Sequence, residues 1–188
     1  LPGGSGVLGG VLGSIAAGTS PVITGGYYNT TVNSGMPGVG NNGGPSTPSL
    51  TGLTSAQMQN ASNFSAFTFT TTTGATGNNW VMVNTDGSLN GAGNATGATG
   101  PMLAAEYSTN IYSSHQLQLM AMNLAGNYTL KQDINAAGTG STGDVWNGAT
   151  FVPVGTGASS AFSGSLDGAG HTISGLVVNR PASDFAGL

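Results

Sequence analysis

Residues 162–176 read Phe-Ser-Gly-Ser-Leu-Asp-Gly-Ala-Gly-His-Thr-Ile-Ser-Gly-Leu and carry the clearest structural signal in this chain. Single apolar residues alternate there with glycines and small polar residues. The same rhythm of short apolar segments broken by glycine extends from residue 128 to the end. Strands of three to five residues spaced about 8–12 residues apart are typical of all-β solenoids, sandwiches and barrels. The stretch therefore predicts an all-β protein rather than an α/β fold.

The composition of the whole chain agrees with this prediction. Gly, Thr, Ser and Asn together supply half of the 188 residues. Glycine and asparagine suit tight turns, and the branched apolar residues between them can be buried on stacked strands. Disordered chains combine low hydrophobicity with high net charge, whereas this chain is 38% apolar with a net charge of −4. We therefore expect a folded, β-rich solenoid.

The unusually low charge excludes several classes of protein. Charged residues make up only 4% of the chain, against about 25% in an ordinary soluble domain. Nucleic-acid binding needs a positive surface, and Lys131 and Arg180 are the only cationic side chains. Cysteine is absent, which excludes a disulfide scaffold and a cysteine zinc site. No window holds the run of about 18 apolar residues that a transmembrane helix requires.

Two short helices are predicted within the β-rich chain. Thr54 suits the N-cap of about two helical turns over residues 54–61. The second helix begins after Ser113 or Ser114 and ends before Gly126. Its apolar stripe at i, i+3, i+4 and i+7 consists of Leu117, Met120, Ala121 and Leu124. We expect this stripe to pack on a core or on a neighbouring unit rather than to bind a separate partner.

Several segments of the C-terminal half together resemble one known kind of unit. They are NYTLKQDI at 127–134, Trp146, FVPVG at 151–155, the stretch at 162–176, and Asn-Arg-Pro at 179–181. This set resembles the opening segment of the GLUG repeat regions of large secreted bacterial adhesins of the filamentous-haemagglutinin type, which are two-partner-secreted exoproteins. DFAGL at 184–188 resembles the start of the first repeat. YSTNI at 107–111 and HQLQLM at 115–120 resemble the short helix that opens such a unit.

The N-terminal half resembles the other end of the same kind of unit. The segment from Val11 to Gly13, continuing through residues 25–30, is similar to a final rung with a degenerate Gly-Leu signature. GLTSAQM at 52–58 resembles the exit segment, together with Phe64, Phe67, the strand-like residues 80–82 and residues 101–103. The order in the chain is therefore an exit segment followed by an opening segment. This order suggests a junction between consecutive units of a tandem array.

The resemblance implies a right-handed parallel β-helix with two short capping or linking α-helices. Residues 1–30 would be terminal rungs of one unit, and the Gly- and Pro-rich residues 31–53 would be a linker. Residues 54–103 would be the exit segment with its short helix and strands. Residues 104–188 would hold a helix and the opening rungs of the next unit. Because the first residue is not Met and both ends look interrupted, we expect a piece of a longer protein.

The function that follows is structural and non-enzymatic. We expect a repeat segment of a large secreted or surface-anchored bacterial adhesin, outside the outer membrane, whose stacked rungs form a stiff stalk or filament. Its partners would be neighbouring repeats or copies of itself, joined by end-to-end β stacking, and host or environmental glycans are further candidates. A carbohydrate-binding β-helix module is the alternative. A polysaccharide lyase or hydrolase is a second alternative, which the six scattered acidic residues disfavour.

The motifs that could carry catalysis or bind a cofactor have simpler interpretations. Residues 138–143 match G-x-G-x-x-G, but no helical pattern follows to hold a pyrophosphate, so a plain loop is predicted. Asp167 and His171 are the only acid and histidine that we expect to lie within reach of each other, and a glycine-assisted turn is the favoured interpretation. Calcium bound by Asp133 or Asp144 with loop carbonyls stays open. No catalytic residue, cofactor or metal site is predicted.

Two kinds of surface site are also predicted. Five asparagines lie in N-x-S/T sequons: Asn29, Asn60, Asn63, Asn94 and Asn127. Asn29 and Asn94 fall in predicted loops and are the favoured glycosylation sites. Trp80 and Trp146 are candidates for stacking on sugar rings, although core packing or edge cover explains them equally well.

Overall fold

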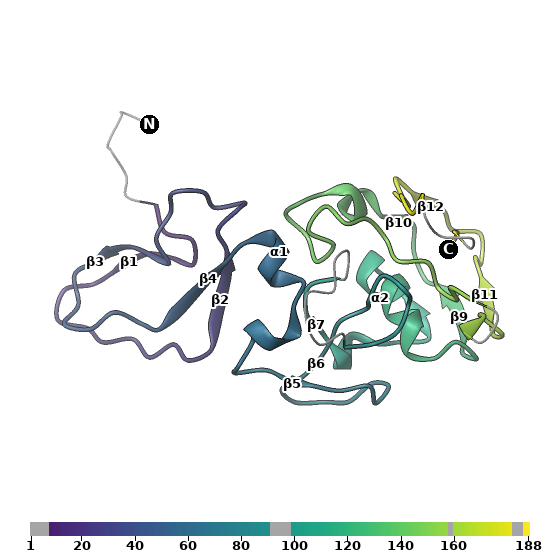
Figure 1. Cartoon of the computed structure of the whole chain (residues 1–188), viewed down its shortest axis with the longest axis horizontal. Helices are drawn as coiled ribbons and strands as arrows, with labels where there is room; N and C mark the ends of the chain where they lie inside the picture. The colour runs from purple at the N-terminus through teal and green to yellow at the C-terminus, as the bar shows by residue number, and fades with distance from the viewer. Residues whose placement is uncertain (1–7, 91–98, 158–159, 182–185) are drawn as a thin grey trace.

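The protein is described by a computed structural model over residues 8–90, 99–157, 160–181 and 186–188 (Figure 1). Short strands dominate these residues and the helices are few and short, so the chain belongs to the all-β class as predicted. The strands form small sheets of two or three members. Most strand pairs are parallel, and several of these parallel pairs join segments that are distant in sequence.

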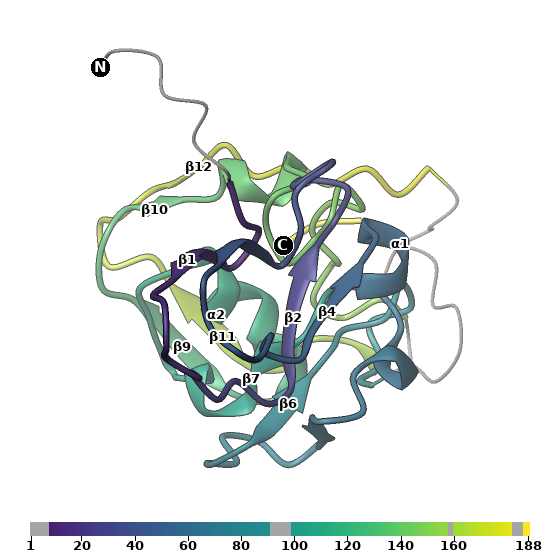
Figure 2. The ribbon, with the colours of Figure 1, turned by 90° about the vertical axis from the view of Figure 1, so that its left-hand side faces the viewer.

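The N-terminal lobe, residues 8–53, contains two passes of the chain laid on each other. Its strands are β1 (Leu12–Ile15), β2 (Gly26–Asn29), β3 (Val39–Asn42) and β4 (Leu50–Leu53). Strand β1 pairs in parallel with β3, and Leu12 lies opposite Val39. Strand β2 pairs in parallel with β4, and Figure 2 shows these two strands side by side. The second pass therefore repeats the course of the first.

The prediction of a linker over residues 31–53 was wrong, because that segment contains β3 and β4. The reason lies in how the interior of this lobe is filled. The Tyr28 ring lies against the backbone of Gly10, Gly38 and Gly52, where an added Cβ would meet its ring atoms. Within β3 and β4 themselves, Val39 and Leu53 are the buried residues, one in each strand, so no alternation of apolar residues shows in the sequence.

The middle segment begins with helix α1 (Ser55–Met58). Thr54 is its N-cap, as predicted, and forms a capping box with Gln57. A 3₁₀ turn, η1 (Ala61–Asn63), and three strands follow: β5 (Thr68–Phe69), β6 (Asn79–Val81) and β7 (Met102–Leu103). Strand β6 pairs in parallel with β5 and antiparallel with β7. This small mixed sheet connects the N-terminal lobe to the rest of the chain (Figure 1).

The C-terminal lobe, residues 99–181, holds the larger set of elements. Its helical elements are η2 (Ala104–Glu106), α2 (Ser114–Leu119), η3 (Met120–Met122) and η4 (Ala137–Gly140). Beyond β7, its strands are β8 (Asn110–Ile111), β9 (Asn127–Leu130), β10 (Ile134–Asn135), β11 (Ser165–Asp167) and β12 (Ile173–Ser174). Parallel pairing gives the strand orders β8-β9-β11 and β10-β12.

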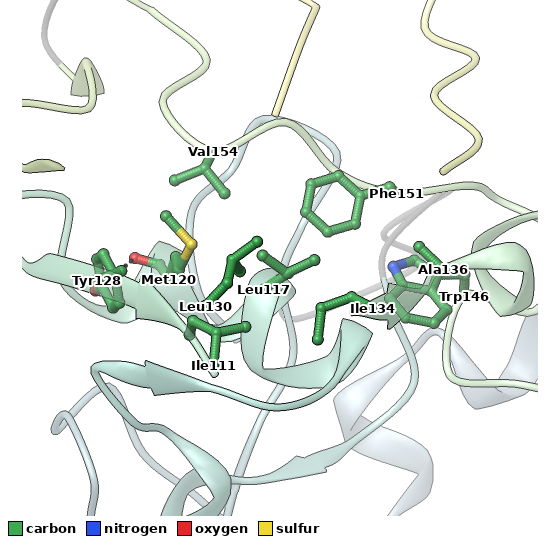
Figure 3. Packing of buried hydrophobic residues seen from close by; sticks show 10 residues of the cluster. All are labelled: Ile111, Leu117, Met120, Tyr128, Leu130, Ile134, Ala136, Trp146, Phe151 and Val154. Atoms are coloured by element: carbon green, nitrogen blue, oxygen red, sulfur yellow. Dashed lines mark hydrogen bonds between the residues drawn. The ribbon is translucent and has the colours of Figure 1, made fainter. Parts of the chain in front are cut away.

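The main hydrophobic core lies inside the C-terminal lobe (Figure 3). Ten residues form it: Ile111, Leu117, Met120, Tyr128, Leu130, Ile134, Ala136, Trp146, Phe151 and Val154. Helix α2 supplies Leu117, and the adjoining η3 turn supplies Met120, so these two residues of the predicted stripe pack on the core as expected. Alternate residues of β9 point inward, which places Tyr128 and Leu130 in the same core.

Helix α2 ends earlier than predicted. Ser113 is its N-cap, but the α-helix stops at Leu119 and continues only as the η3 turn. Asn123 then adopts an extended conformation, and the Tyr128 hydroxyl donates a hydrogen bond to its carbonyl oxygen over 2.7 Å. This bond holds the chain in a turn before Gly126, so the tertiary contact rather than the glycine terminates the helix.

A buried glutamine organises the interior beside the core. Gln118 is fully buried, and its amide oxygen accepts hydrogen bonds from the Trp146 indole N–H and the Val152 backbone N–H. Its amide nitrogen donates to the Val152 carbonyl oxygen at 2.9 Å. A buried polar group is stable only when it is hydrogen-bonded, and here both the oxygen and the nitrogen of the amide have partners. Gln118 therefore fixes the position of the loop that carries Trp146.

Candidate functional site

A cleft of about 250 Å³ lies where the N-terminal lobe meets the C-terminal lobe. We call it the interlobe cleft. It is lined by Asn29, Val32, Asn33, Met58, Gly100, Pro101, Gly143, Asp144, Val145 and Asn147. These residues come from the end of β2 and the turn after it, the end of α1, the segment before β7 and the loop after η4. Segments that are more than 100 residues apart in sequence therefore build one site.

Asn29 ties the two lobes together at this cleft. Its side-chain N–H groups donate to the Ser55 hydroxyl at 2.9 Å and to the Asn147 side-chain oxygen at 3.1 Å. Its side-chain oxygen accepts from the backbone N–H groups of Thr31 and Val32. The amide nitrogen that a glycan would modify is already engaged twice and half-buried. Glycosylation at Asn29 stays a prediction, and Asn94 lies outside the described residues.

Asp144 brings a charged group into the cleft and holds it there. The His115 Nε2 donates to the Asp144 Oδ1 at 2.7 Å, and the Val145 backbone N–H donates to the same oxygen. On its other side, His115 Nδ1 lies 3.6 Å from Glu106 Oε2. The imidazole also packs edge-on against the Trp146 indole. His115 thus joins α2 to the loop that lines the cleft.

This arrangement corrects the expectation that Asp167 and His171 are the only acid and histidine within reach of each other. His115 contacts two carboxylates that lie far from it in sequence. His171 Nδ1 lies 3.4 Å from Asp133 Oδ1, and no contact with Asp167 is found among the described residues. Asp167 instead accepts a hydrogen bond from the Ala169 backbone N–H, as expected for a turn.

The described residues offer little for a metal ion. No group of three or more potential metal-ligating side chains occurs among them. Asp133 accepts a hydrogen bond from the Thr172 backbone N–H at 2.9 Å and faces His171. Residues 137–140 form a 3₁₀ turn, and no α-helix follows the G-x-G-x-x-G match within the described part of the chain. That segment is therefore a loop, as predicted.

The two tryptophans lie in different environments. Trp146 is fully buried, and its indole has no exposed face that a sugar could stack on, so that hypothesis was wrong for this residue. Trp80 is half-buried, and Phe67 stacks on its ring with centroids 4.0 Å apart and planes nearly parallel. Phe67 in turn contacts Phe64 and Tyr27, which places Trp80 at the end of an aromatic cluster. Sugar stacking at Trp80 stays a prediction.

Sequence reasoning missed the interlobe cleft almost entirely. Asn33 and Asn147 carry no motif, and Asp144 was considered only for calcium. The pairing of His115 with Asp144 spans 29 residues and depends on where α2 and the loop after η4 meet. Asn29 was singled out through its sequon alone, and in the structure its side chain connects the lobes.

Comparisons with known proteins are sparse. No protein-family model matches the chain, and no solved structure matches it. The chain is similar to halomucin of Haloquadratum walsbyi, with 44% identity over 62 residues. That match covers 32% of this chain and 1% of halomucin. The chain therefore spans a very small part of the curated relative that it matches. No helix in the described ranges is long and apolar enough to cross a membrane.

Proposed function

We propose that this chain is a structural repeat segment of a large secreted or surface-anchored bacterial adhesin of the filamentous-haemagglutinin type. In this proposal its strands are rungs of a right-handed parallel β-helix that forms a stiff stalk or filament. The segment has no catalytic role, and it acts outside the outer membrane by holding a distal binding region away from the cell. Neighbouring repeats or copies of the chain stack on its ends.

The observation that carries the proposal is the parallel pairing at long sequence separation. Asn127 pairs with Ser165 across 38 residues, and Ile134 pairs with Ile173 in the next strand pair. In the N-terminal lobe, Ser14 pairs with Asn41 across 27 residues. In the N-terminal lobe β1 and β2 pair with β3 and β4, and in the C-terminal lobe β9 and β10 pair with β11 and β12. In both lobes, therefore, two consecutive strands pair in order with two later consecutive strands. Neighbouring coils of a solenoid have this relationship.

Side chains along these pairs favour continued stacking. The Ser165 hydroxyl lies 2.9 Å from the Asn127 side-chain oxygen, and Asn41 donates to the Ser14 hydroxyl at 3.5 Å. Each contact joins two uncharged polar residues that are opposite each other in the ladder. Like charges in the same positions would repel one another in every added coil. A chain with 4% charged residues avoids that repulsion.

The outer edge of the C-terminal lobe offers a place for the next coil. Among the described strands, β11 has β9 as its one partner and β12 has β10. Partly buried apolar residues of this outer pass lie against the main core: Phe162, Leu166, Ile173, Leu176 and Val178. A further coil would cover them and pair with the free edges of both strands, as repeat architectures require. The similarity to a minute fraction of halomucin supports membership of a very long chain.

Fibre diffraction on oriented samples of the natural full-length protein tests this proposal. A parallel β-helix stacks its strands along the fibre, so we expect a meridional reflection at about 4.7–4.9 Å. Electron micrographs of the same sample should show rods of constant width. Round particles without that reflection would contradict the proposal.

A carbohydrate-binding module is the second candidate function, and the position of Trp80 favours it. Its indole is partly exposed at the end of an aromatic cluster, and Phe67 covers one ring face. Aromatic rings of this kind stack on the C–H faces of sugars. On a glycan array, Trp80→Ala should abolish binding and Trp80→Phe should retain part of it. Equal binding by the wild-type chain and both variants would exclude Trp80 as the site.

A further inference from the structure

The interlobe cleft contains hydrogen-bonding groups that the fold does not use. Asp144 receives two hydrogen bonds at Oδ1, while Oδ2 has no hydrogen-bond partner among the described residues. Asn33 donates one N–H to the Asn29 carbonyl oxygen, which leaves its side-chain oxygen and a second N–H. Asn147 donates one N–H to the Val145 carbonyl oxygen and retains another. The cleft therefore presents both acceptors and donors.

Apolar groups share the same lining. Val32, Met58, Pro101 and Val145 contribute carbon surface next to these polar atoms. Val32 is 47% exposed, so this surface is open to solvent. Small-molecule sites in proteins typically combine an apolar lining with a few polar groups that fix the orientation of the ligand. The interlobe cleft has this composition, and its polar groups come from both lobes.

We propose that the interlobe cleft binds a single neutral sugar ring, such as one residue of a glycan. Sugar hydroxyls can donate to the free oxygens of Asp144 and Asn33 and accept from the amide N–H groups of Asn33 and Asn147. The C–H groups of the ring can pack on the apolar surface. The volume of about 250 Å³ is below the range of about 300–1,000 Å³ for sites of drug-sized ligands, which suits one ring.

The charge of the cleft favours a neutral sugar over anionic ligands and over calcium. Asp144 is the one charged residue in the lining, so anionic ligands are repelled and no Lys or Arg compensates. Calcium takes six to eight oxygen ligands and usually several carboxylates, whereas one carboxylate oxygen is free here. His115 already holds the other oxygen of Asp144. We therefore expect neutral sugars to bind and sialic or uronic acids to be rejected.

Ligand-observed saturation-transfer NMR tests this inference, and it works whether the chain is monomeric or assembled. The 188-residue chain is mixed with glucose, galactose, mannose, fucose and the two N-acetylhexosamines, and separately with glucuronic and sialic acid. One ring with few hydrogen bonds should bind with a dissociation constant on the order of 1 mM. Saturation transfer to at least one neutral sugar and to neither acid is the expected result. No transfer to any neutral sugar at about 50 mM, well above this constant, would overturn the proposal.

Two variants locate the site. Asn33→Ala removes an acceptor and a donor and should weaken binding about tenfold. Val32→Lys keeps the backbone N–H bond to Asn29 and introduces a long charged side chain into the lining of the cleft, which should abolish binding. Ser34→Ala lies in the same turn outside the lining and should leave affinity unchanged. Thermal unfolding of each variant confirms that it is folded.

The same experiment separates the cleft from the aromatic cluster. Trp80→Ala should leave the signal intact if the sugar occupies the interlobe cleft. Loss of binding in Trp80→Ala, with full binding retained in Asn33→Ala and Val32→Lys, would overturn the assignment to the cleft. Because the assay does not depend on stacking of coils, its outcome is independent of the proposed stalk.

Discussion

The N-terminal and C-terminal lobes share a ladder of parallel strands but differ in what fills them. In the C-terminal lobe, Trp146 and Phe151 are fully buried within a continuous core. In the N-terminal lobe, Tyr28 rests on glycines, and a second cavity of about 250 Å³ opens beside β3 and β4. We call this cavity the N-terminal hollow. It is lined by Pro37, Gly38, Val39, Gly40, Asn42, Thr47, Pro48 and Leu50.

The comparison teaches that backbone pairing and side-chain packing contribute separately to this fold. Parallel pairing aligns two passes of the chain in both lobes, but a buried core of large residues adds most of the stability in one of them. The N-terminal lobe gains support from its neighbours instead. Tyr27 contacts Phe64 and Phe67, and Asn29 donates to Asn147. We therefore expect the N-terminal lobe to unfold more readily than the C-terminal lobe.

The largest effect is expected from Trp146→Ala, which removes the biggest buried side chain of the C-terminal lobe. It creates a cavity and leaves the Gln118 oxygen without the indole N–H, at a cost of about 3–5 kcal/mol in the free energy of unfolding. Urea denaturation followed by circular dichroism measures the loss. Trp80→Ala, at a half-buried position, is the matched control and should cost less than half as much. Equal losses of stability in the two variants would contradict the distinction between the buried core position of Trp146 and the half-buried position of Trp80.

Gly164→Ala tests the close contact between the segment before β11 and the segment before β9 in the C-terminal lobe. A Cβ at Gly164 would collide with the backbone carbonyl of Gly126, which cannot move without breaking the turn before β9. We expect a loss of about 1–3 kcal/mol in the free energy of unfolding. Gly13→Ala is the control, because an added Cβ there meets nothing within 4 Å. If neither Gly164→Ala nor Gly13→Ala changes the free energy of unfolding, the contact between Gly164 and Gly126 is looser than described.

Leu50→Phe tests whether the N-terminal hollow can accept a larger side chain. Leu50 lines the hollow, so a larger ring can fill space there and should stabilise the lobe by about 1 kcal/mol. Hydrogen exchange of the β1–β4 amides reports this local gain. Val154→Phe, in the filled core, is the counterpart and should destabilise the protein. A destabilising Leu50→Phe would show that the hollow does not accept more volume.

The smallest expected effect on stability comes from Asp133, which lies just before β10 and contacts Thr172 and His171, just before β12. The backbone N–H of Thr172 donates to Asp133 and lowers the pKa of its carboxyl below the ordinary value of 3.8, with a further contribution from His171. A lowered folded-state pKa means that ionised Asp133 stabilises the fold above pH 3.8. That contribution is lost as the pH falls through the lower folded-state value.

Asp133→Asn should therefore reduce the loss of stability between about pH 5 and pH 2. Hydrogen exchange of the Ile134 amide, which donates to the Thr172 carbonyl oxygen, gives the local measurement. Asp86→Asn is a suitable comparison, because the hydroxyl and the backbone N–H of Ser88 lower the pKa of Asp86 in another part of the chain. It should leave exchange at Ile134 unchanged. An unchanged pH dependence in Asp133→Asn would contradict the assigned contact.

The two lobes also differ in how far the sequence predicts them. The apolar rhythm of residues 162–176 predicted the all-β class, Thr54 marked the start of the first helix, and Ser113 or Ser114 marked the start of the second. Strands β3 and β4 were missed because each buries a single residue, Val39 or Leu53, so inward-facing apolar residues do not recur along the strand. A period-2 pattern depends on those residues, and without them a strand resembles a loop.

The candidate site was less predictable than the fold. Asp144, His115 and Asn147 carry no spacing signal, because their contacts arise only where α2, the loop after η4 and the end of β2 meet. The burial of Trp146 was likewise invisible in the sequence. Its partner is Gln118, a polar residue in a helix whose apolar stripe gives no sign that this amide is buried.

Paired cysteines test most directly the claim that parallel coils are stacked in both lobes, since the chain has no cysteine of its own. Asn127→Cys with Ser165→Cys, and Ser14→Cys with Asn41→Cys, place thiols opposite each other in the ladders. Neighbouring strands lie about 4.8 Å apart, within the Cα separation that a disulfide spans. We predict that both pairs form intramolecular disulfides on mild oxidation, while Asn127→Cys with Asp167→Cys does not. Failure of both matched pairs, or efficient bridging of the offset pair, would contradict the stacked-coil account.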